Sequence, residues 1–129
     1  MNEIHSDGFQ FHANPSPVGG GFTLVDSDGD VIERKTVLKV GMTNNEAELL
    51  GVVRAVELIE SEGIVFTDSK VIARCVHRGR ARSRPDLNEV ISKCKEQIKK
   101  KKVEIKFVPR KENLAGLYNE NHRPVATQS

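Results

Sequence analysis

Apolar and polar positions alternate in three short segments within the first forty residues. Residues 3–12 (EIHSDGFQFH) broadly alternate, and residues 19–40 contain two further alternating segments that meet at Asp28-Gly29. A period of two is typical of strands buried on one face, and an Asp-Gly pair is typical of a hairpin turn. The pattern therefore predicts three strands that form an antiparallel meander.

From residue 43 onward a helical period takes over, and strands then alternate with helices. Residues 43–63 place apolar side chains at helical spacing, and Gly63 is expected to cap the end of this helix. The following segments are predicted as a strand (64–68), a helix (69–78), a helix (86–100), a strand (103–108) and a short final helix. Strands separated by helices pair in parallel. The expected fold class is therefore α/β, with a five-stranded mixed sheet of three antiparallel and two parallel strands flanked by helices.

Length and composition limit the organisation of the chain. With 129 residues and 37% hydrophobic content, the chain can form one ordinary core. We expect one domain over residues 1–121 and a flexible polar tail over residues 122–129.

No apolar run approaches the roughly 18 residues of a membrane span, and residues 1–10 lack the features of a signal peptide. These features favour a monomeric cytoplasmic protein without a membrane partner. Cys75 and Cys94 lack metal-ligand spacing and are interpreted as buried thiols.

The net charge of +2 conceals a strong asymmetry. Residues 71–111 contain 14 Lys or Arg against 4 Asp or Glu, and the rest of the chain contains 6 against 14. Four arginines lie two apart in a loop with Gly and Pro, where they serve no helix: Arg78, Arg80, Arg82 and Arg84. This arginine loop is interpreted as a phosphate-binding surface. The run Lys99–Lys102 lies at the end of a predicted helix. A solvated helix end therefore explains this run as well as a phosphate-binding surface does.

Some acidic residues have local explanations. Residues 26–30 (DSDGD) lack the downstream glutamate of a calcium loop and are interpreted as a hairpin turn. Glu46 completes a capping box with Thr43, in which its side chain would reach back to the Thr43 backbone N–H. Asp68 precedes a predicted helix, and capping of that helix is the simpler interpretation for it taken alone.

Three acids remain when positions in the predicted fold are compared. Asp7 lies on the first strand before Gly8, a residue that permits close approach of another backbone or a ligand. Glu48 falls on the apolar flank of the first helix, where a carboxylate is costly unless it is paired or bound to metal. Together with Asp68, these acids could converge at one edge of the sheet. Clustered carboxylates select Mg²⁺ or Mn²⁺, and beside a basic surface they indicate metal-dependent chemistry on a phosphodiester.

Five segments resemble the ribonuclease H family in order and spacing. They are Asp7-Gly8, residues 14–25 (NPSPVGGGFTLV), 43–51 (TNNEAELLG), 66–70 (FTDSK) and 108–116 (VPRKENLAG). The resemblance covers about residues 2–121. Several segments in register make it far more specific than any one of them alone.

The resemblance implies a fold, an activity and a set of site residues. It implies a ribonuclease H-like fold and metal-dependent hydrolysis of the RNA strand of RNA–DNA hybrids, with two Mg²⁺ or Mn²⁺ ions bound in the substrate complex. Asp7, Glu48 and Asp68 match catalytic, metal-binding carboxylates. The nucleic-acid-binding positions are Asn14, Thr43, Asn44 and Asn45, which in the family distinguish the RNA strand from the paired DNA strand.

One position departs from the family. In the family, the run that resembles residues 108–115 is followed by a fourth catalytic carboxylate, and this chain has Gly116 at that position. Glu120, one helical turn later, is a candidate replacement ligand, and Asn119 is another. Three interpretations stay open: an active enzyme that tolerates the loss, a catalytically silent hybrid-binding module, and an enzyme carrying an introduced substitution. The three intact acids favour the enzyme.

Overall fold

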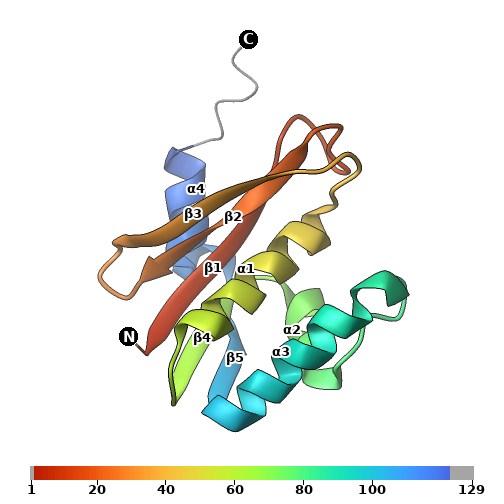
Figure 1. Ribbon diagram of the computed structural model, residues 1–129. Coiled ribbons are helices and arrows are strands. Elements are labelled where there is room, and N and C mark those ends of the chain that lie inside the picture. The colour runs from red at the N-terminus through yellow and green to blue at the C-terminus, as the bar shows by residue number, and fades with distance from the viewer. Residues whose placement is uncertain (1, 123–129) are drawn as a thin grey trace.

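The computed structural model describes residues 2–122 and contains one five-stranded sheet (Figure 1). Its strands are β1 (Glu3–Gln10), β2 (Gly19–Asp26), β3 (Val31–Leu38), β4 (Gly63–Thr67) and β5 (Val103–Phe107). The order across the sheet is β3-β2-β1-β4-β5. The first three strands pair antiparallel, whereas β1 with β4 and β4 with β5 pair in parallel. The mixed sheet predicted from the sequence is thus confirmed.

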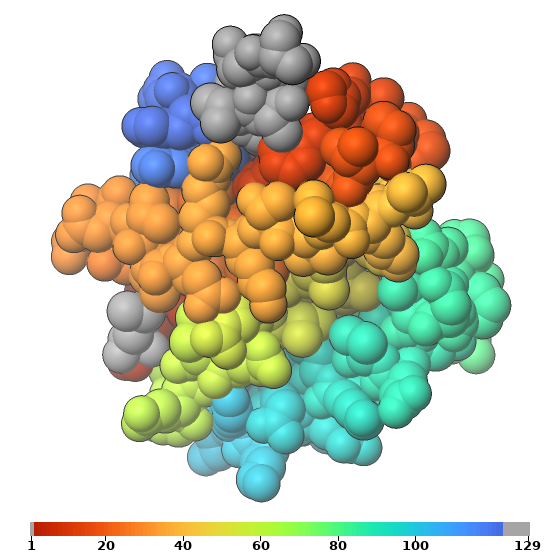
Figure 2. Space-filling view, turned by 45° about the horizontal axis from the view of Figure 1, so that its top comes forward, coloured from red at the N-terminus to blue at the C-terminus, as the bar shows by residue number. Residues whose placement is uncertain are grey.

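Four helices cover the sheet. They are α1 (Asn44–Leu58), α2 (Lys70–Arg78), α3 (Asn88–Lys101) and α4 (Leu114–Asn121). In Figure 1, α4 lies behind β1 to β3, and α1 crosses in front of the sheet next to α2 and α3. In the space-filling view, β3 and the segment after it form an orange band across one face, with α1 and α3 beside it (Figure 2). None of the helices in residues 2–122 is both long enough and apolar enough to span a membrane.

The core lies between α1 and the sheet and requires a close approach of the two. Ile4, Val52 and Val65 are fully buried there. A Cβ atom at Gly8 would lie 2.6 Å from the backbone nitrogen of Glu48, and so would displace α1. Gly8 therefore allows the α1 backbone to approach β1, which matches the interpretation of this glycine from the sequence.

The predicted end of the first helix is wrong in detail. The helix α1 ends at Leu58, and Gly63 begins β4 instead of capping the helix. The chain leaves the helix at Ile59, which is extended and fully buried. The predicted tail lies outside the described residues from position 123 onward. Cys75 and Cys94 are free and buried, as predicted.

Candidate active site

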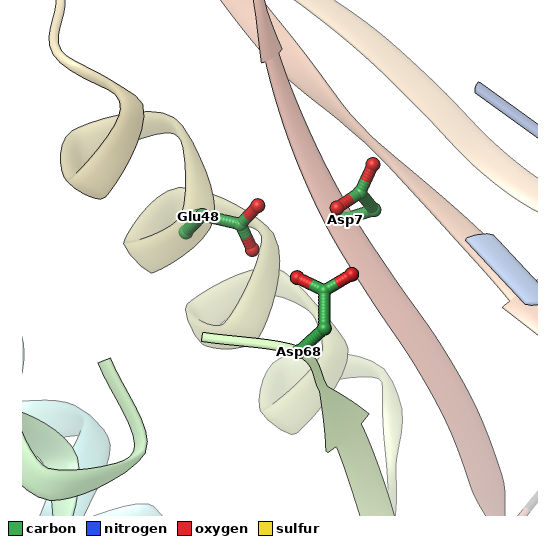
Figure 3. Close-up of side chains that lie close together, drawn as sticks. All are labelled: Asp7, Glu48 and Asp68. Carbon is green, nitrogen blue, oxygen red and sulfur yellow. The ribbon is translucent and has the colours of Figure 1, made fainter. Parts of the chain in front are cut away.

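The three acids singled out in the sequence meet where β1 and β4 separate. The parallel pairing of these strands ends at Ser6 with Thr67, so Asp7 and Asp68 follow the last paired residues. Ligands of open α/β sheets bind at the carboxyl ends of strands where neighbouring connections diverge. Glu48 enters the same region from α1, as Figure 3 shows.

Asp7 lies on β1 with 1% of its surface exposed. Its Oδ2 accepts a hydrogen bond of 2.8 Å from Nδ2 of Asn119 on α4. Its Oδ1 is buried and has no hydrogen-bond partner among residues 2–122. One carboxylate oxygen is therefore held by the protein, and the other is left for a ligand.

Like Asp7, Glu48 has one carboxylate oxygen that the protein holds and one that it does not. It is buried in the second turn of α1, and its Oε1 accepts a hydrogen bond of 3.0 Å from the backbone N–H of Gly8. Its Oε2 is buried and has no hydrogen-bond partner in the part of the chain that the structure describes. The close approach of α1 and β1 at Gly8 is thus what places this carboxylate.

Asp68 is not the cap of α2. Ser69 takes that role, since its Oγ accepts a hydrogen bond of 3.2 Å from the backbone N–H of Ile72. The Asp68 carboxylate is therefore available for the site, and its Oδ2 accepts a hydrogen bond of 3.2 Å from Nδ2 of Asn113.

The three carboxylates form one compact group. One oxygen of each lies within 4.8 Å of those of the other two. Burial raises the pKa of Asp7, and the nearby charge of Asp68 raises it further. Burial and the charge of Asp7 raise the pKa of Glu48 well above its ordinary value. Burial also raises the pKa of Asp68, although Arg110 and Asn113 oppose that effect.

This donor set fits a divalent cation. Two buried oxygens without partners, Asp7 Oδ1 and Glu48 Oε2, need a proton or a cation close by. Hard carboxylate oxygens are the ligands that Mg²⁺ and Mn²⁺ prefer. Asp7, Glu48 and Asp68 are the residues that would hold such an ion.

Position 116 faces the cluster, but Glu120 does not join it. A Cβ atom built on Gly116 would lie 3.3 Å from Oδ2 of Asp68. The Glu120 side chain is 48% exposed, and its Oε1 accepts a hydrogen bond of 3.0 Å from Nε of Arg110. The structure therefore assigns Glu120 to an ion pair at the rim and does not place it as the replacement ligand considered from the sequence.

A cleft of about 750 Å³ opens over the three carboxylates. Besides them, its lining includes Gln10, Asn44, Lys70, Phe107 and Arg110. The positive charge of Arg110 acts on both Asp7 and Asp68. A phosphodiester entering the cleft would thus meet cationic side chains at its margin and carboxylates at its floor.

The polar residues expected to contact nucleic acid lie at the start of α1. The Oδ1 of Asn14 accepts a hydrogen bond of 2.9 Å from the backbone N–H of Asn44, which joins two segments thirty residues apart. Thr43 caps α1, since its Oγ1 accepts a hydrogen bond from the backbone N–H of Glu46. Asn44 and Asn45 are exposed. The structure therefore brings Asn14, Thr43, Asn44 and Asn45 to one surface beside the cleft.

The capping box predicted at Glu46 is half formed. The Thr43 hydroxyl accepts the Glu46 N–H, but the Glu46 carboxylate forms ion pairs with Lys39 and Arg84. A buried carboxylate gains more from two cations than from one backbone N–H. Glu46 thereby holds part of the arginine loop against the start of α1.

The four arginines of the arginine loop differ in their contacts. Arg84 forms an ion pair of 2.8 Å with Asp86 and lies 3.5 Å from Glu46. Arg78 is the last residue of α2 and so does not lie in the loop as predicted; it is half-buried and reaches Sγ of Cys75. Arg80 and Arg82 are exposed. Two of the four are thus engaged within the protein, and two face solvent.

The sequence interpretation missed the supporting role of two amides. Asn113 is fully buried, caps α4 through Oδ1, and donates through Nδ2 to Asp68 and to the carbonyl oxygen of Ser6. Asn119 donates to Asp7 instead of offering its oxygen to the cluster. The position of Asn113 directly before a helix signals a cap, but no sequence signal indicates its second partner.

Comparisons with known proteins agree with this geometry. A family model described as reverse transcriptase-like matches residues 5–116. A ribonuclease H from Dinoroseobacter shibae is 39% identical over 64 residues, an alignment that covers 46% of this chain and 41% of that protein.

Solved structures extend the likeness over most of the chain. The RNase H1 named LC11, isolated from compost by a metagenomic approach, superposes with a TM-score of 0.65 at 26% identity, covering 92% of both chains. The same enzyme in complex with an RNA/DNA hybrid gives 0.61 at 26% identity, over 86% of this chain and 87% of that one. The N-terminal RNase H domain of a Mycobacterium tuberculosis protein gives 0.65 at 26% identity, over 88% and 90%. The match of the family model over most of the sequence, on this fold, means that the chain belongs to the ribonuclease H family, in its reverse transcriptase-like group.

Proposed function

We propose that this protein is a divalent-metal-dependent endonuclease that hydrolyses the RNA strand of RNA–DNA hybrids and acts as a monomer. The observation that carries the proposal is the carboxylate cluster, in which Asp7, Glu48 and Asp68 each have one oxygen anchored by an N–H donor. Two of their remaining oxygens are buried and find no hydrogen-bond partner within the described residues. A cluster that is fixed in place and incompletely paired is suited to holding cations.

The substrate assignment rests on the surface beside the cluster. The similar enzyme LC11 has been solved in complex with an RNA/DNA hybrid. In this chain, Asn44 lines the cleft, and its backbone N–H donates to Oδ1 of Asn14, so the side-chain amide of Asn14 lies next to a residue of the cleft. Amide side chains can donate to and accept from a ribose 2′-hydroxyl, the group that distinguishes RNA from DNA.

The reaction is the attack of water on the phosphorus atom of the RNA strand. The bond from phosphorus to the 3′ oxygen breaks, which leaves a 3′-hydroxyl on one product and a 5′-phosphate on the other. Cations held by the three carboxylates, two in the substrate complex, would activate the water and stabilise charge on the phosphate. Gly8, Asn113 and Asn119 hold the carboxylates in place, and Arg110, which lines the cleft, would meet the phosphate.

Gly116 lowers the rate of this reaction in our proposal. Without a carboxylate at position 116, one ion has a ligand fewer, and Mg²⁺ tolerates such a loss poorly because it requires near-ideal octahedral geometry. A catalytically silent hybrid-binding module is the second candidate, and the absence of an acid at this position favours it.

A cleavage assay separates the two candidates. An end-labelled RNA–DNA hybrid is incubated with the protein and Mg²⁺ or Mn²⁺, with EDTA as the control and Asp68→Asn as the matched variant. We expect RNA fragments with the parent protein, and none with EDTA or with the variant. Hybrid affinity should change little in the variant, since phosphate contacts dominate affinity. Hybrid binding without any cleavage in either metal would establish the binding module instead.

A further inference from the structure

Three residues on neighbouring strands form a row that leads to the cluster. Asp7 on β1 is opposite Thr23 on β2, and Thr23 is opposite Arg34 on β3. Residues directly opposite each other on paired strands project from the same face of a sheet. The helix α4 packs on this face, and its Asn119 contacts both Asp7 and Thr23.

A chain of hydrogen bonds connects this row with α4. Nε of Arg34 donates to Oγ1 of Thr23 at 3.1 Å. The Thr23 hydroxyl donates to Oδ1 of Asn119 at 2.6 Å, and Nδ2 of Asn119 donates to Oδ2 of Asp7 at 2.8 Å. Thr23 is fully buried, and Asn119 is 6% exposed. Solvent therefore has little access to the two bonds of Asn119, whereas the bond from Arg34 is only partly buried.

The direction of the bonds fixes which end of the Asn119 amide faces the cluster. Arg34 can only donate, so the Thr23 oxygen accepts from it and directs its own proton to Oδ1 of Asn119. The amide nitrogen then faces Asp7. In the reverse orientation, an amide oxygen would face a carboxylate oxygen, which is unfavourable in a buried site.

Arg34 is itself held in place at the exposed edge of the sheet. One of its terminal nitrogens donates to the carbonyl oxygen of His122 at 2.9 Å. Its guanidinium carbon lies 4.9 Å from the ring centre of Phe9 and 5.7 Å from that of Tyr118. The outer end of the hydrogen-bond chain is thus anchored to β1 and to the end of α4.

We propose that Asn119 is a positioning residue for Asp7, and that Thr23 and Arg34 set its orientation. This chain of hydrogen bonds holds Oδ2 of Asp7 so that Oδ1, which has no partner among the described residues, faces the other carboxylates. The hydrogen-bond chain then sets how strongly the site binds a divalent cation. This inference rests on the proposed function, because it requires the cluster to be a metal site.

The test compares two substitutions at one buried position. Thr23→Val keeps the shape of the side chain and removes the hydroxyl, whereas Thr23→Ser keeps the hydroxyl. Mn²⁺ affinity is measured by calorimetry on the folded proteins without substrate. Substitution of residues that orient metal ligands typically weakens affinity about 10- to 100-fold. We expect about a tenfold loss for Thr23→Val and a change of less than about twofold for Thr23→Ser.

Variants outside the core make the test independent of folding. Arg34 is exposed, so Arg34→Ala should fold, and we expect it to weaken Mn²⁺ binding by about two- to fivefold, less than loss of the hydroxyl. Asn121→Ala, at an exposed position on α4, the helix that also contains Asn119, should leave the Mn²⁺ affinity unchanged. Equal Mn²⁺ affinity in Thr23→Val and the parent, even with a loss of thermal stability, would show that the hydrogen-bond chain only stabilises the fold. That result would overturn the proposal. A parent protein that binds no Mn²⁺ would contradict the proposed function as well.

Discussion

The Cβ position of Gly116 lies 3.3 Å from Oδ2 of Asp68, so a side chain at position 116 would extend directly toward the carboxylate cluster. Asn113, the residue that caps α4, donates to Asp68 through its side-chain amide. The final helix thus approaches the cluster with an amide and a glycine at the place where the resemblance implies a fourth acid.

Gly116→Asp should raise the rate of hybrid cleavage, most clearly with Mg²⁺. The added carboxylate would supply a ligand beside Asp68, while Mn²⁺ should already support part of the activity of the parent. Initial cleavage rates in the two metals measure the effect. We expect the Asp variant to narrow the difference between Mn²⁺ and Mg²⁺.

Two controls separate a new ligand from an effect on the helix. Gly116→Ala removes the helix penalty of glycine, about 0.8–1.0 kcal/mol, without offering a ligand. Leu117→Asp introduces the same charge at the next, half-buried position on α4. Equal rates for the Ala and Asp variants at position 116 would show that this position does not contribute to a metal site.

Glu48→Gln should stabilise the metal-free protein at neutral pH. Because burial raises the pKa of Glu48, the folded state binds a proton more tightly than the unfolded state does. The free energy of unfolding is therefore highest at low pH and falls as the pH rises from the ordinary carboxyl range through the raised pKa. The fall amounts to about 1.4 kcal/mol for each pH unit that separates the folded-state pKa from the unfolded one. Glutamine removes this loss and can keep the bond from the Gly8 N–H through its oxygen.

Urea unfolding in EDTA at pH 5, 7 and 8 measures the difference. The parent should lose more stability over this range than Glu48→Gln, and a second series with Mn²⁺ in place of EDTA should restore stability in the parent alone. Glu104→Gln, at an exposed position on β5, is the matched control. Parallel pH profiles for the parent and Glu48→Gln would contradict the raised pKa.

Much of this site can be predicted because its acids have signals in the sequence. Glu48 stands on the apolar side of a helical pattern, and Asp7 precedes a glycine on a strand. Asp68 is ambiguous, because the sequence cannot decide between two neighbouring residues that can both cap a helix; in the structure Ser69 takes the cap. The pattern places the end of α1 too late because the buried Ile59 fits the helical spacing while its backbone is extended.

The partners of polar side chains are much less predictable. Glu120 lies one helical turn after Gly116, which makes it a reasonable ligand, but the ion pair with Arg110 draws it to the rim. Asn119 is a candidate ligand from its position, and its amide nitrogen instead faces Asp7 because of Thr23, which is 96 residues away in the chain. Such pairings depend on tertiary contacts that local patterns do not contain.

Gly8→Ala should weaken both the fold and the metal site. An added methyl group would lie 2.6 Å from the backbone of Glu48, so α1 would have to move away from β1. Overpacking of this kind typically costs about 1–3 kcal/mol. Thermal unfolding and Mn²⁺ calorimetry should both show a loss. An unchanged Mn²⁺ affinity in the folded variant would show that the approach at Gly8 does not place the Glu48 carboxylate.

Replacing Arg80 and Arg82 together by Ala should weaken hybrid binding and reduce its dependence on salt. Both side chains are exposed, whereas Arg84 is tied to Asp86 and Glu46, so the first two are free to meet phosphates. Removing one arginine–phosphate pair should lower the slope of log affinity against log salt by about 0.9, and removing both should lower it by about 1.8. Hybrid affinity measured by fluorescence anisotropy between roughly 50 and roughly 200 mM salt gives this slope.

The matched control is Lys99→Ala with Lys100→Ala, which removes two exposed charges from the end of α3. A similar reduction of the slope in both double variants would mean that only total charge matters, and an unchanged slope for the arginine pair would leave this loop as a solvated surface.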